Sequence, residues 1–332
     1  MCQIRSLSLL LVSFIACSKG YSVGEEGFYL HPKVAPWFTG PLLTPSANVI
    51  KVGHANIEPY LYATKIFGSY DKNWHPRINP VKTWNINVQL PIQAGLIERF
   101  EVTINPQVFY NYNHNGSSIR FADLPIGIGY QLRKRGDIGE TYWPAIKLII
   151  AETFPTGKYQ HLDGTKGAAV DSSGSGSYST RFGTTLGQTY HLSGLHYLSP
   201  RFHASYIIHT PTHVKGFNTY GGAADTNATV IRRAFLNTTL GLEYSVTKNW
   251  ALALDIASFY RGKRTFRGNP GHSATGVRLD LSAPSSNQIS LAPAFEYNWS
   301  SQLGLITGAW FTVAGRNSSR FISSVTAFNY YY

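Results

Sequence analysis

Hydrophobic and polar residues alternate along most of this chain. Residues 84–93, for example, read Trp-Asn-Ile-Asn-Val-Gln-Leu-Pro-Ile-Gln, and similar alternation recurs at 100–111, 124–133 and 288–299. Neighbouring side chains of a β-strand point to opposite faces, so each of these segments has one apolar face and one polar face. The pattern therefore predicts β-strands and an all-β protein.

Twelve such segments can be counted, and most are longer than an ordinary soluble strand. A tilted strand needs about 9 to 11 residues to cross a bilayer, whereas strands of soluble proteins usually have about five or six. An even number of crossings returns both ends of the chain to the same side of a membrane. The predicted strands are residues 56–68, 82–93, 99–112, 121–133, 142–154, 178–192, 200–210, 231–246, 249–262, 286–299, 302–315 and 319–332.

The connections and the segment ends favour a membrane barrel over a soluble sandwich, whose strands also alternate. Short turns alternate with three long polar connections, Pro155–Tyr178, Pro211–Val230 and Gly262–Gln288. Outer-membrane barrels have this arrangement, with aromatic residues at both membrane interfaces. We therefore predict a transmembrane antiparallel up-and-down β-barrel of about twelve strands in a Gram-negative outer membrane. The aromatic residues near segment ends are Trp84, Tyr110, Trp143, Trp250, Tyr260 and Trp299.

Prolines inside the predicted strands argue against this interpretation, because each removes a donor from the strand ladder. We expect Pro125 and Pro293 to mark β-bulges. Glu152 shares the parity of the lipid-facing Ile150, and a further bulge near the outer rim would return it to the lumen. The prolines concerned are Pro59, Pro91, Pro106, Pro125, Pro144 and Pro293.

The first residues resemble an export signal. Arg5 supplies a positive start, an apolar stretch follows, and small residues after it suit cleavage following Ser18. Residues 1–18 are thus predicted to be a removed signal peptide, 19–55 a periplasmic N-terminal segment and 56–332 the barrel.

A lipoprotein signal is an alternative, because Phe14-Ile15-Ala16-Cys17 is loosely similar to a lipobox. Cys2 and Cys17 are the two cysteines of the chain, and both lie in this signal. The mature chain would then have neither a disulfide nor a cysteine metal site.

The chain is basic but sparsely charged. Its 29 lysines and arginines outnumber its 17 aspartates and glutamates, yet charged residues make up only 14% of the sequence. The cations are scattered and no nucleic-acid motif accompanies them, so we predict no nucleic-acid partner. One cationic segment, with Arg261, Lys263, Arg264 and Arg267, would either attract anionic solutes or contact lipopolysaccharide phosphates, and we favour the second.

By alternation, the polar strand faces bring charged residues into the lumen. Charges in a dry core are costly without partners, and a watery lumen removes that cost. Barrels of about eight strands are filled by side chains and those of about sixteen hold a channel, so twelve allows a narrow pore or a closed lumen. The charges either line a solute path or brace the barrel as ion pairs. They are Glu58, Glu101, Asp123, Arg133, Lys147, Arg181, Arg233, Glu243, Asp255, Arg261 and Glu296.

Enzymatic arrangements are weak. His203 and Ser205 share one strand face, which is similar to the His-x-Ser of outer-membrane phospholipases, where a base activates a serine. Alternation places both in the lumen and no third residue can be assigned to orient the histidine, so we predict a lumen hydrogen bond and no enzyme. His209 and His213 lack the helix that would make them joint metal ligands. The sequence has no phosphate loop or dinucleotide motif, and it implies no cofactor.

Three stretches resemble known bacterial barrels. Phe328, Tyr330 and Tyr332 share one face and resemble the C-terminal signal that the barrel-assembly machinery reads. Pro144-Ala145-Ile146-Lys147-Leu148-Ile149-Ile150, closed by Phe154-Pro155-Thr156-Gly157-Lys158-Tyr159, is similar to a family of outer-membrane barrels named for the meta-pathway of phenol degradation. Thr39-Gly40-Pro41-Leu42-Leu43-Thr44-Pro45, with Gly53-His54 and Glu58-Pro59-Tyr60, is similar to the N-terminal start of related barrels. The resemblance implies uptake of hydrophobic or aromatic compounds and brings no catalytic residues.

The sequence therefore predicts an outer-membrane channel for passive passage of small solutes. Its predicted partners are outer-membrane lipid and lipopolysaccharide, the barrel-assembly machinery and a small-molecule solute. The alternatives are a non-conducting surface barrel that binds partners through its loops, and a barrel enzyme that acts on lipid.

Overall fold

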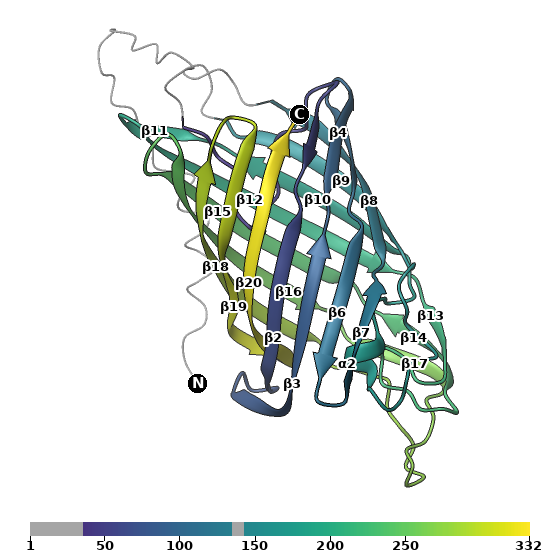
Figure 1. Ribbon diagram of the computed structural model, residues 1–332. Helices are drawn as coiled ribbons and strands as arrows, with labels where there is room; N and C mark the ends of the chain where they lie inside the picture. Colours follow the sequence, from purple (N-terminus) through teal and green to yellow (C-terminus); the bar gives the residue numbers. More distant parts are fainter. Residues whose placement is uncertain (1–35, 135–142) are drawn as a thin grey trace, which may run out of the picture. The chain divides into compact units, whose positions relative to one another are not determined.

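The strands close into one antiparallel barrel of twelve wall strands (Figure 1). The computed structural model describes residues 36–134 and 143–332. The last strand, β20 (Ser318–Tyr331), pairs with β1 (Ala55–Ile57) and β2 (Tyr60–Tyr70), so the two edges of the sheet meet, as a bilayer requires. The other wall strands are β3 (Pro76–Gln89) with β4 (Ile92–Ile97), β5 (Phe100–Ile104) with β6 (Gln107–Asn113), β7 (Gly116–Phe121) with β8 (Leu124–Arg133), β9 (Ala145–Phe154), β10 (Ser179–Gly187) with β11 (Tyr190–Ser193), β12 (His196–His209), β15 (Phe235–Ser245), β16 (Trp250–Arg261), β18 (Ser286–Asn298) and β19 (Leu303–Arg316).

The twelve predicted segments correspond one to one to these wall strands, with shifted ends. The largest shifts are at the second strand, which starts at Pro76 instead of 82, and at the fourth, which starts at Gly116 instead of 121. The predicted signal peptide and the start of the segment 142–154 fall outside the described residues.

Three wall strands are interrupted where a proline removes the backbone donor. Pro59 separates β1 from β2, Pro91 separates β3 from β4, and Pro106 separates β5 from β6. Together with Pro125 they form a row across neighbouring strands, and their carbonyls still accept hydrogen bonds, such as that from Glu58 N–H to Pro91 O at 3.0 Å. The proline carbonyls thus keep the wall joined at this row.

The predicted bulges at Pro125 and Pro293 are wrong. Pro125 pairs with Thr153 and Pro293 pairs with Leu254, each in unshifted register. The register between β2 and both of its neighbours shifts instead between Ile66 and Gly68. A proline can therefore occupy a wall strand here without an inserted residue, because its carbonyl still accepts and only one ladder donor is lost.

Glu152 stays on the outer face, so its predicted return to the lumen is also wrong. The register of β9 is unshifted at this position, where Glu152 pairs with Ile126 and Thr180. The Thr180 hydroxyl donates to Glu152 Oε2 at 2.6 Å, so the neighbouring strand supplies a partner for the carboxylate.

The long connections gather at one end of the barrel, called the loop end, and Ala55 and Tyr332 lie at the other, called the terminal end (Figure 1). At the loop end, β13 (Thr212–Lys215), β14 (Asn227–Arg232) and β17 (Arg264–Asn269) form a small antiparallel sheet, and a single helical turn, α2 (Ala168–Asp171), packs against β6 and β7. This sheet has its own buried core and was not predicted. The core consists of Val214, Tyr220, Ala228, Val230 and Leu281.

Within residues 36–134 and 143–332, no helix has the length and apolar character needed to cross a membrane.

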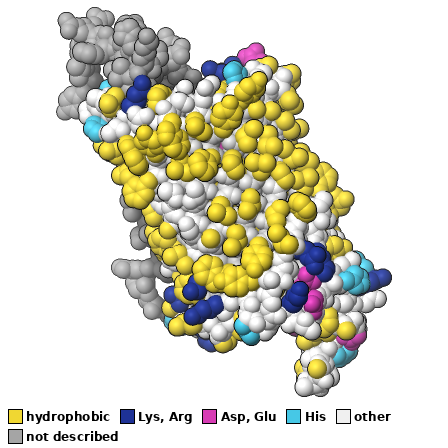
Figure 2. Space-filling view, viewed as in Figure 1, with side chains coloured by type: hydrophobic (Ala, Val, Ile, Leu, Met, Phe, Trp, Pro, Cys, Tyr) yellow, Lys and Arg dark blue, Asp and Glu magenta, His cyan; other side chains and the backbone are white. Residues whose placement is uncertain are grey.

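The outer face of the wall is apolar. Ile150, Phe182 and Phe295 on three different strands are 47%, 47% and 60% exposed. Figure 2 shows apolar side chains spread over the wall, with charged side chains near the two ends. An apolar belt around a closed barrel is the surface that lipid contact requires. The C-terminal Phe328 and Tyr330 belong to this face, at 48% and 47% exposure.

Candidate functional site: the barrel lumen

The inner face of the wall carries the charges that alternation predicted, with one exception. Glu58, Glu101, Asp123, Lys147, Arg181, Arg233, Glu243, Asp255, Arg261 and Glu296 lie on it or at its loop-end mouth. Arg133 lies on the outer face instead. A register shift after Gln131 sets Arg133 opposite Ile146, and its guanidinium lies over the ring of Trp143 at 5.5 Å.

Residues 36–54, called the lumen segment, run inside the barrel at the terminal end. They belong to residues 19–55, which we predicted to form a periplasmic N-terminal segment. Inner-wall side chains accept hydrogen bonds from its backbone, which satisfies the N–H groups of a segment that belongs to no sheet. The donors and acceptors are Thr39 N–H and Glu296 Oε2 (2.8 Å), Thr44 N–H and Asp255 Oδ1 (3.1 Å), Val49 N–H and Gln131 Oε1 (2.7 Å), and Ile50 N–H and Glu101 Oε2 (2.9 Å).

Small residues of the inner wall make room for the lumen segment. A Cβ atom added to Gly241 of β15 would lie 2.7 Å from Pro41 Cγ and 2.8 Å from Thr44 Cβ. Leu42 is buried and anchors the segment by its apolar side chain. The buried wall residues in its cluster are Ala253, Ala292, Ala294, Ile306, Val325 and Ala327.

Two buried ion pairs join wall strands beside the lumen segment. Lys147 Nζ lies 2.8 Å from Glu101 Oε1, and the two side chains are 1% and 3% exposed. Arg201, which the sequence did not single out, lies with its guanidinium 2.6 Å from Glu243 Oε2. A buried charge is costly without a partner or hydrogen bonds, and each of these pairs joins two wall strands, so these residues brace the wall.

Two neighbouring cavities occupy the loop-end half of the lumen. The mouth cavity, of about 550 Å³, lies beneath the long connections, and the aromatic cavity, of about 840 Å³, extends along β2, β19 and β20. Both are lined by Arg261, Ser286 and Asn317, so these three residues lie between the two cavities.

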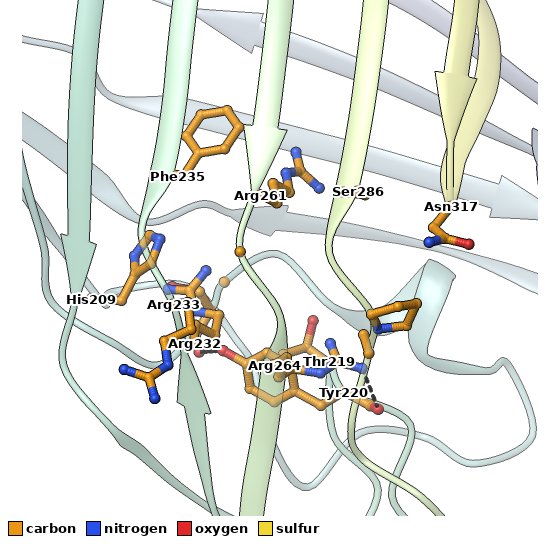
Figure 3. Close-up of a pocket in the computed structure, with 15 residues that line it drawn as sticks. His209, Thr219, Tyr220, Arg232, Arg233, Phe235, Arg261, Arg264, Ser286 and Asn317 are labelled. Carbon is orange, nitrogen blue, oxygen red and sulfur yellow. Dashed lines mark hydrogen bonds between the residues drawn. The ribbon is translucent and has the colours of Figure 1, made fainter. Parts of the chain in front are cut away.

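Four arginines line the mouth cavity, and Figure 3 shows them on neighbouring segments around the same space. They are Arg232, Arg233, Arg261 and Arg264. Within the described part of the chain, none of the four has a carboxylate oxygen within 4.0 Å, since the ion pairs there involve other cations. The mouth cavity is therefore strongly cationic.

Two of these guanidinium groups contact aromatic rings, and one of the two also donates a hydrogen bond to a backbone carbonyl. Arg261 lies over the ring of Phe235 at 5.3 Å, and Arg264 lies over the ring of Tyr220 at 4.9 Å. Arg264 Nε also donates to Leu281 O at 2.7 Å. Burial lowers the pKa of the Arg264 guanidinium from its ordinary value, and the nearby charge of Arg232 lowers it further, despite the opposing influence of Tyr220 and Asp280.

The aromatic cavity is lined by rings from several strands. Trp310 meets Phe321 edge-on at 4.7 Å, and its indole N–H donates to Ser290 Oγ at 2.9 Å. Phe259 stacks on Phe235 at 5.9 Å and so connects these rings to the arginines of the mouth. Other aromatic lining residues are Tyr70 and Phe109.

The connection 155–178 is fixed at the mouth by a buried carboxylate. Asp171 accepts hydrogen bonds from Arg120 at 2.8 Å, from Lys158 at 2.6 Å and from Asp163 N–H at 2.9 Å. Burial raises the pKa of the Asp171 carboxyl, but the bonds from Lys158 and Arg120 outweigh this and lower it to about 2. Asp171 is therefore ionised at any ordinary pH.

The predicted cationic segment is divided between two surfaces. Arg261 and Arg264 line the mouth cavity, whereas Lys263 and Arg267 are exposed. Contact with lipopolysaccharide phosphates, the interpretation that we favoured, therefore applies only to Lys263 and Arg267.

Of the residues considered for catalysis and metal binding, His203, Ser205 and His209 face the lumen, whereas His213 is exposed on β13. His203 Nδ1 lies 2.9 Å from the hydroxyl of Thr185, and Ser205 Oγ is buried without a hydrogen-bond partner among the described residues. The predicted lumen hydrogen bond of His203 thus goes to Thr185 instead of Ser205. Among the residues that the structure places, no group of three or more His, Cys, Asp or Glu side chains is arranged to hold a metal ion.

Comparison with known proteins shows the fold. No protein-family model and no curated protein matches the sequence. The crystal structure of an outer-membrane channel from Pseudomonas putida F1 superimposes with a TM-score of 0.62 at 13% identity, covering 86% of this chain and 98% of the channel. The transport unit of the autotransporter AIDA-I from Escherichia coli superimposes with a TM-score of 0.45 at 12% identity, covering 88% of this chain and 94% of the transport unit. The monoaromatic hydrocarbon channel CymD superimposes with a TM-score of 0.37 at 12% identity, covering 85% of this chain and 88% of CymD. Only the first supports an inference, which is the barrel architecture.

Proposed function

We propose that this protein is an outer-membrane channel for passive passage of small solutes. The observation that carries the proposal is the division of the wall into an apolar outer face and a polar inner face around neighbouring cavities. The channel from Pseudomonas putida, which has the same barrel architecture, agrees with this proposal.

The lumen segment makes the terminal end the narrow part of the path. Cavities of about 500 and 150 Å³ flank it, and both are lined in part by the segment itself. Its anchors on the wall include hydrogen bonds from backbone N–H groups to the carboxylates of Glu101, Asp255 and Glu296, which exchange for water at modest net cost. Movement of the segment would therefore widen the path without unfolding the barrel.

The aromatic cavity supports the finer part of the proposal, that the solutes include aromatic ones. Rings of Phe259, Trp310 and Phe321 line a space that a small planar molecule can enter. Membership in the family named for the meta-pathway of phenol degradation is part of the same proposal and rests on the sequence resemblance.

The remaining features of the proposal concern export and assembly. We propose that residues 1–18 are a removed signal peptide, that the outward Phe328, Tyr330 and Tyr332 address the assembly machinery, and that Lys263 and Arg267 contact lipopolysaccharide phosphates. The chain is proposed to act without catalysis, since Ser205 faces the lumen and not lipid.

Electrical recording tests the channel function. Folded protein inserted into planar bilayers should give discrete conductance steps, and vesicles that contain it should admit small solutes. Folding is checked independently by the slower gel migration of heated samples. A protein that is folded by this criterion but gives neither conductance nor solute flux would contradict the proposal and favour a surface barrel that binds partners.

A further inference from the structure

We propose that the mouth cavity binds small organic anions that carry an aromatic ring, of the class of arene carboxylates. The inference rests on the proposed channel function and deepens it by naming the class of solute. It is built from two neighbouring features of the lumen, a cationic mouth (Figure 3) and a ring-lined wall.

The cationic mouth supplies the recognition of the anion. Guanidinium groups donate pairs of parallel N–H bonds that match the two oxygens of a carboxylate. Arg233 and Arg261 are exposed to the cavity, and the buried Nε of Arg232 has no hydrogen-bond partner within the described residues. The site thus has donors in place and, in the part of the chain that the structure places, no carboxylate oxygen within 4.0 Å of its four guanidinium groups.

The ring-lined wall supplies the recognition of the aromatic group. Arg261 borders both cavities, so a carboxylate bound to it leaves its ring beside Phe259. Offset or edge-on ring contacts are favourable beyond the burial of apolar area. A simple inorganic anion would use only the arginines, whereas an arene carboxylate would use both features.

The cavity sizes agree with a ligand of this class. Volumes of about 550 and 840 Å³ fall in the range typical of sites for small molecules. The cavities lie on the inner face of the barrel, away from the apolar belt, so a solute reaches them more readily than a membrane lipid does.

Binding is measured by calorimetry on the purified full-length barrel in detergent. Three probes separate the two features: benzoate carries charge and ring, benzyl alcohol carries the ring alone, and inorganic phosphate carries charge alone. We expect benzoate to bind at least about tenfold more tightly than either of the others. Phosphate that binds as tightly as benzoate would overturn the proposal in favour of a free phosphate or lipid-headgroup site.

Paired charge-removing variants locate the site. Arg233→Gln with Arg261→Gln should weaken benzoate binding by about tenfold or more, because two charge-assisted contacts are lost. The matched control is Lys263→Gln with Arg267→Gln, which removes the same charge from exposed positions on the same part of the chain and should change binding by less than about twofold. Equal weakening by both pairs would show a general charge effect and overturn the site.

A ring variant completes the test. Phe259→Leu should weaken benzoate binding and leave phosphate binding unchanged, and the opposite pattern would contradict the role of the rings.

The experiments distinguish failure of the proposed channel function from failure of the proposed binding site. Benzoate binding that depends on Arg233 and Arg261 in a barrel without conductance supports the site and contradicts the channel. Conductance in a barrel that does not bind benzoate supports the proposed channel function and contradicts the proposed arene-carboxylate site.

Discussion

Lys147 and Glu101 show how single charged residues are accommodated inside this barrel. Their charged atoms are 2.8 Å apart, and both side chains are almost fully buried. Glu101 also accepts the backbone N–H of Ile50, so one carboxylate joins two parts of the wall to the lumen segment. Removing only one member of such a pair leaves an uncompensated buried charge.

We therefore predict that Lys147→Met destabilises the barrel by about 3 to 5 kcal/mol. The double variant Lys147→Met with Glu101→Gln should be less destabilised, because no unpaired charge is left behind. Unfolding by guanidinium chloride in detergent, followed by tryptophan fluorescence, measures both. If the double variant proves as unstable as the single one, the unpaired charge is not the cause.

The alternation of hydrophobic and polar residues in the sequence was sufficient to identify the charged residues that face the lumen, but not their partners. Ten predicted charges lie inside or at the mouth because β-strand parity is fixed wherever lipid covers one face. Arg133 was misplaced because a register shift reverses parity, and nothing in the local sequence marks that shift. Arg201 and Arg232 were missed because their roles depend on Glu243 and the mouth cavity, which only the closed barrel brings to them.

Among the elements, the lumen segment has the most direct consequence for function. It narrows the terminal end, and its fit depends on the small residues of the inner wall, above all Gly241. The sequence contained a hint of this fit, since two leucines between prolines at 41–45 lie in no predicted strand and need an apolar partner. Only the folded wall shows that this partner is inside the barrel.

We predict that Gly241→Val displaces the lumen segment and raises single-channel conductance. A side chain at this position would overlap Pro41 and Thr44, whose nearest atoms are 2.7 and 2.8 Å from the added Cβ. Gly183→Val is the matched control, because Gly183 also faces the lumen but its nearest neighbours belong to wall residues His203 and Ser205. Equal conductance of the two variants would show that the segment does not limit the path.

The connection 155–178 should depend on pH through Asp171. The pKa of this carboxyl is lowered from 3.8 to about 2 in the folded protein, so ionisation stabilises the folded connection above pH 4 and the benefit is lost as the pH falls towards 2. Hydrogen exchange of residues 155–178, corrected for intrinsic rates, should be slow at pH 5 and faster at pH 2.5.

Asp171→Asn is the control for this effect. It should exchange faster than the wild type already at pH 5 and change little on acidification, since the ion pairs with Arg120 and Lys158 are gone at both pH values. If hydrogen exchange of residues 155–178 in the wild type becomes faster only above pH 4, or does not change with pH, a group other than Asp171 controls the stability of this connection.

The whole molecule follows from one physical requirement, that every backbone donor and acceptor in lipid finds a partner. Long alternating segments in even number satisfy it by closing into a barrel, and for this reason the fold could be predicted from the sequence almost strand by strand. The small sheet of β13, β14 and β17 could not, because it lies beyond the lipid and its pairing joins segments far apart in the chain. The place of the lumen segment inside the barrel could not be predicted either, because it lies in no strand and its partners are side chains of distant wall strands.

The most direct test of the account uses neighbouring residues on opposite faces of β2. Thr64 lines the aromatic cavity, and Lys65 points outward over the ring of Trp84. Cys2 and Cys17 are first replaced by serine, and a single cysteine is then introduced at each position. Each variant is treated with a bulky cationic thiol reagent during bilayer recording. Modification of Thr64→Cys should reduce the conductance and that of Lys65→Cys should leave it unchanged. Equal effects at the two positions, or no effect at Thr64→Cys after complete labelling, would contradict a solute path through the lumen.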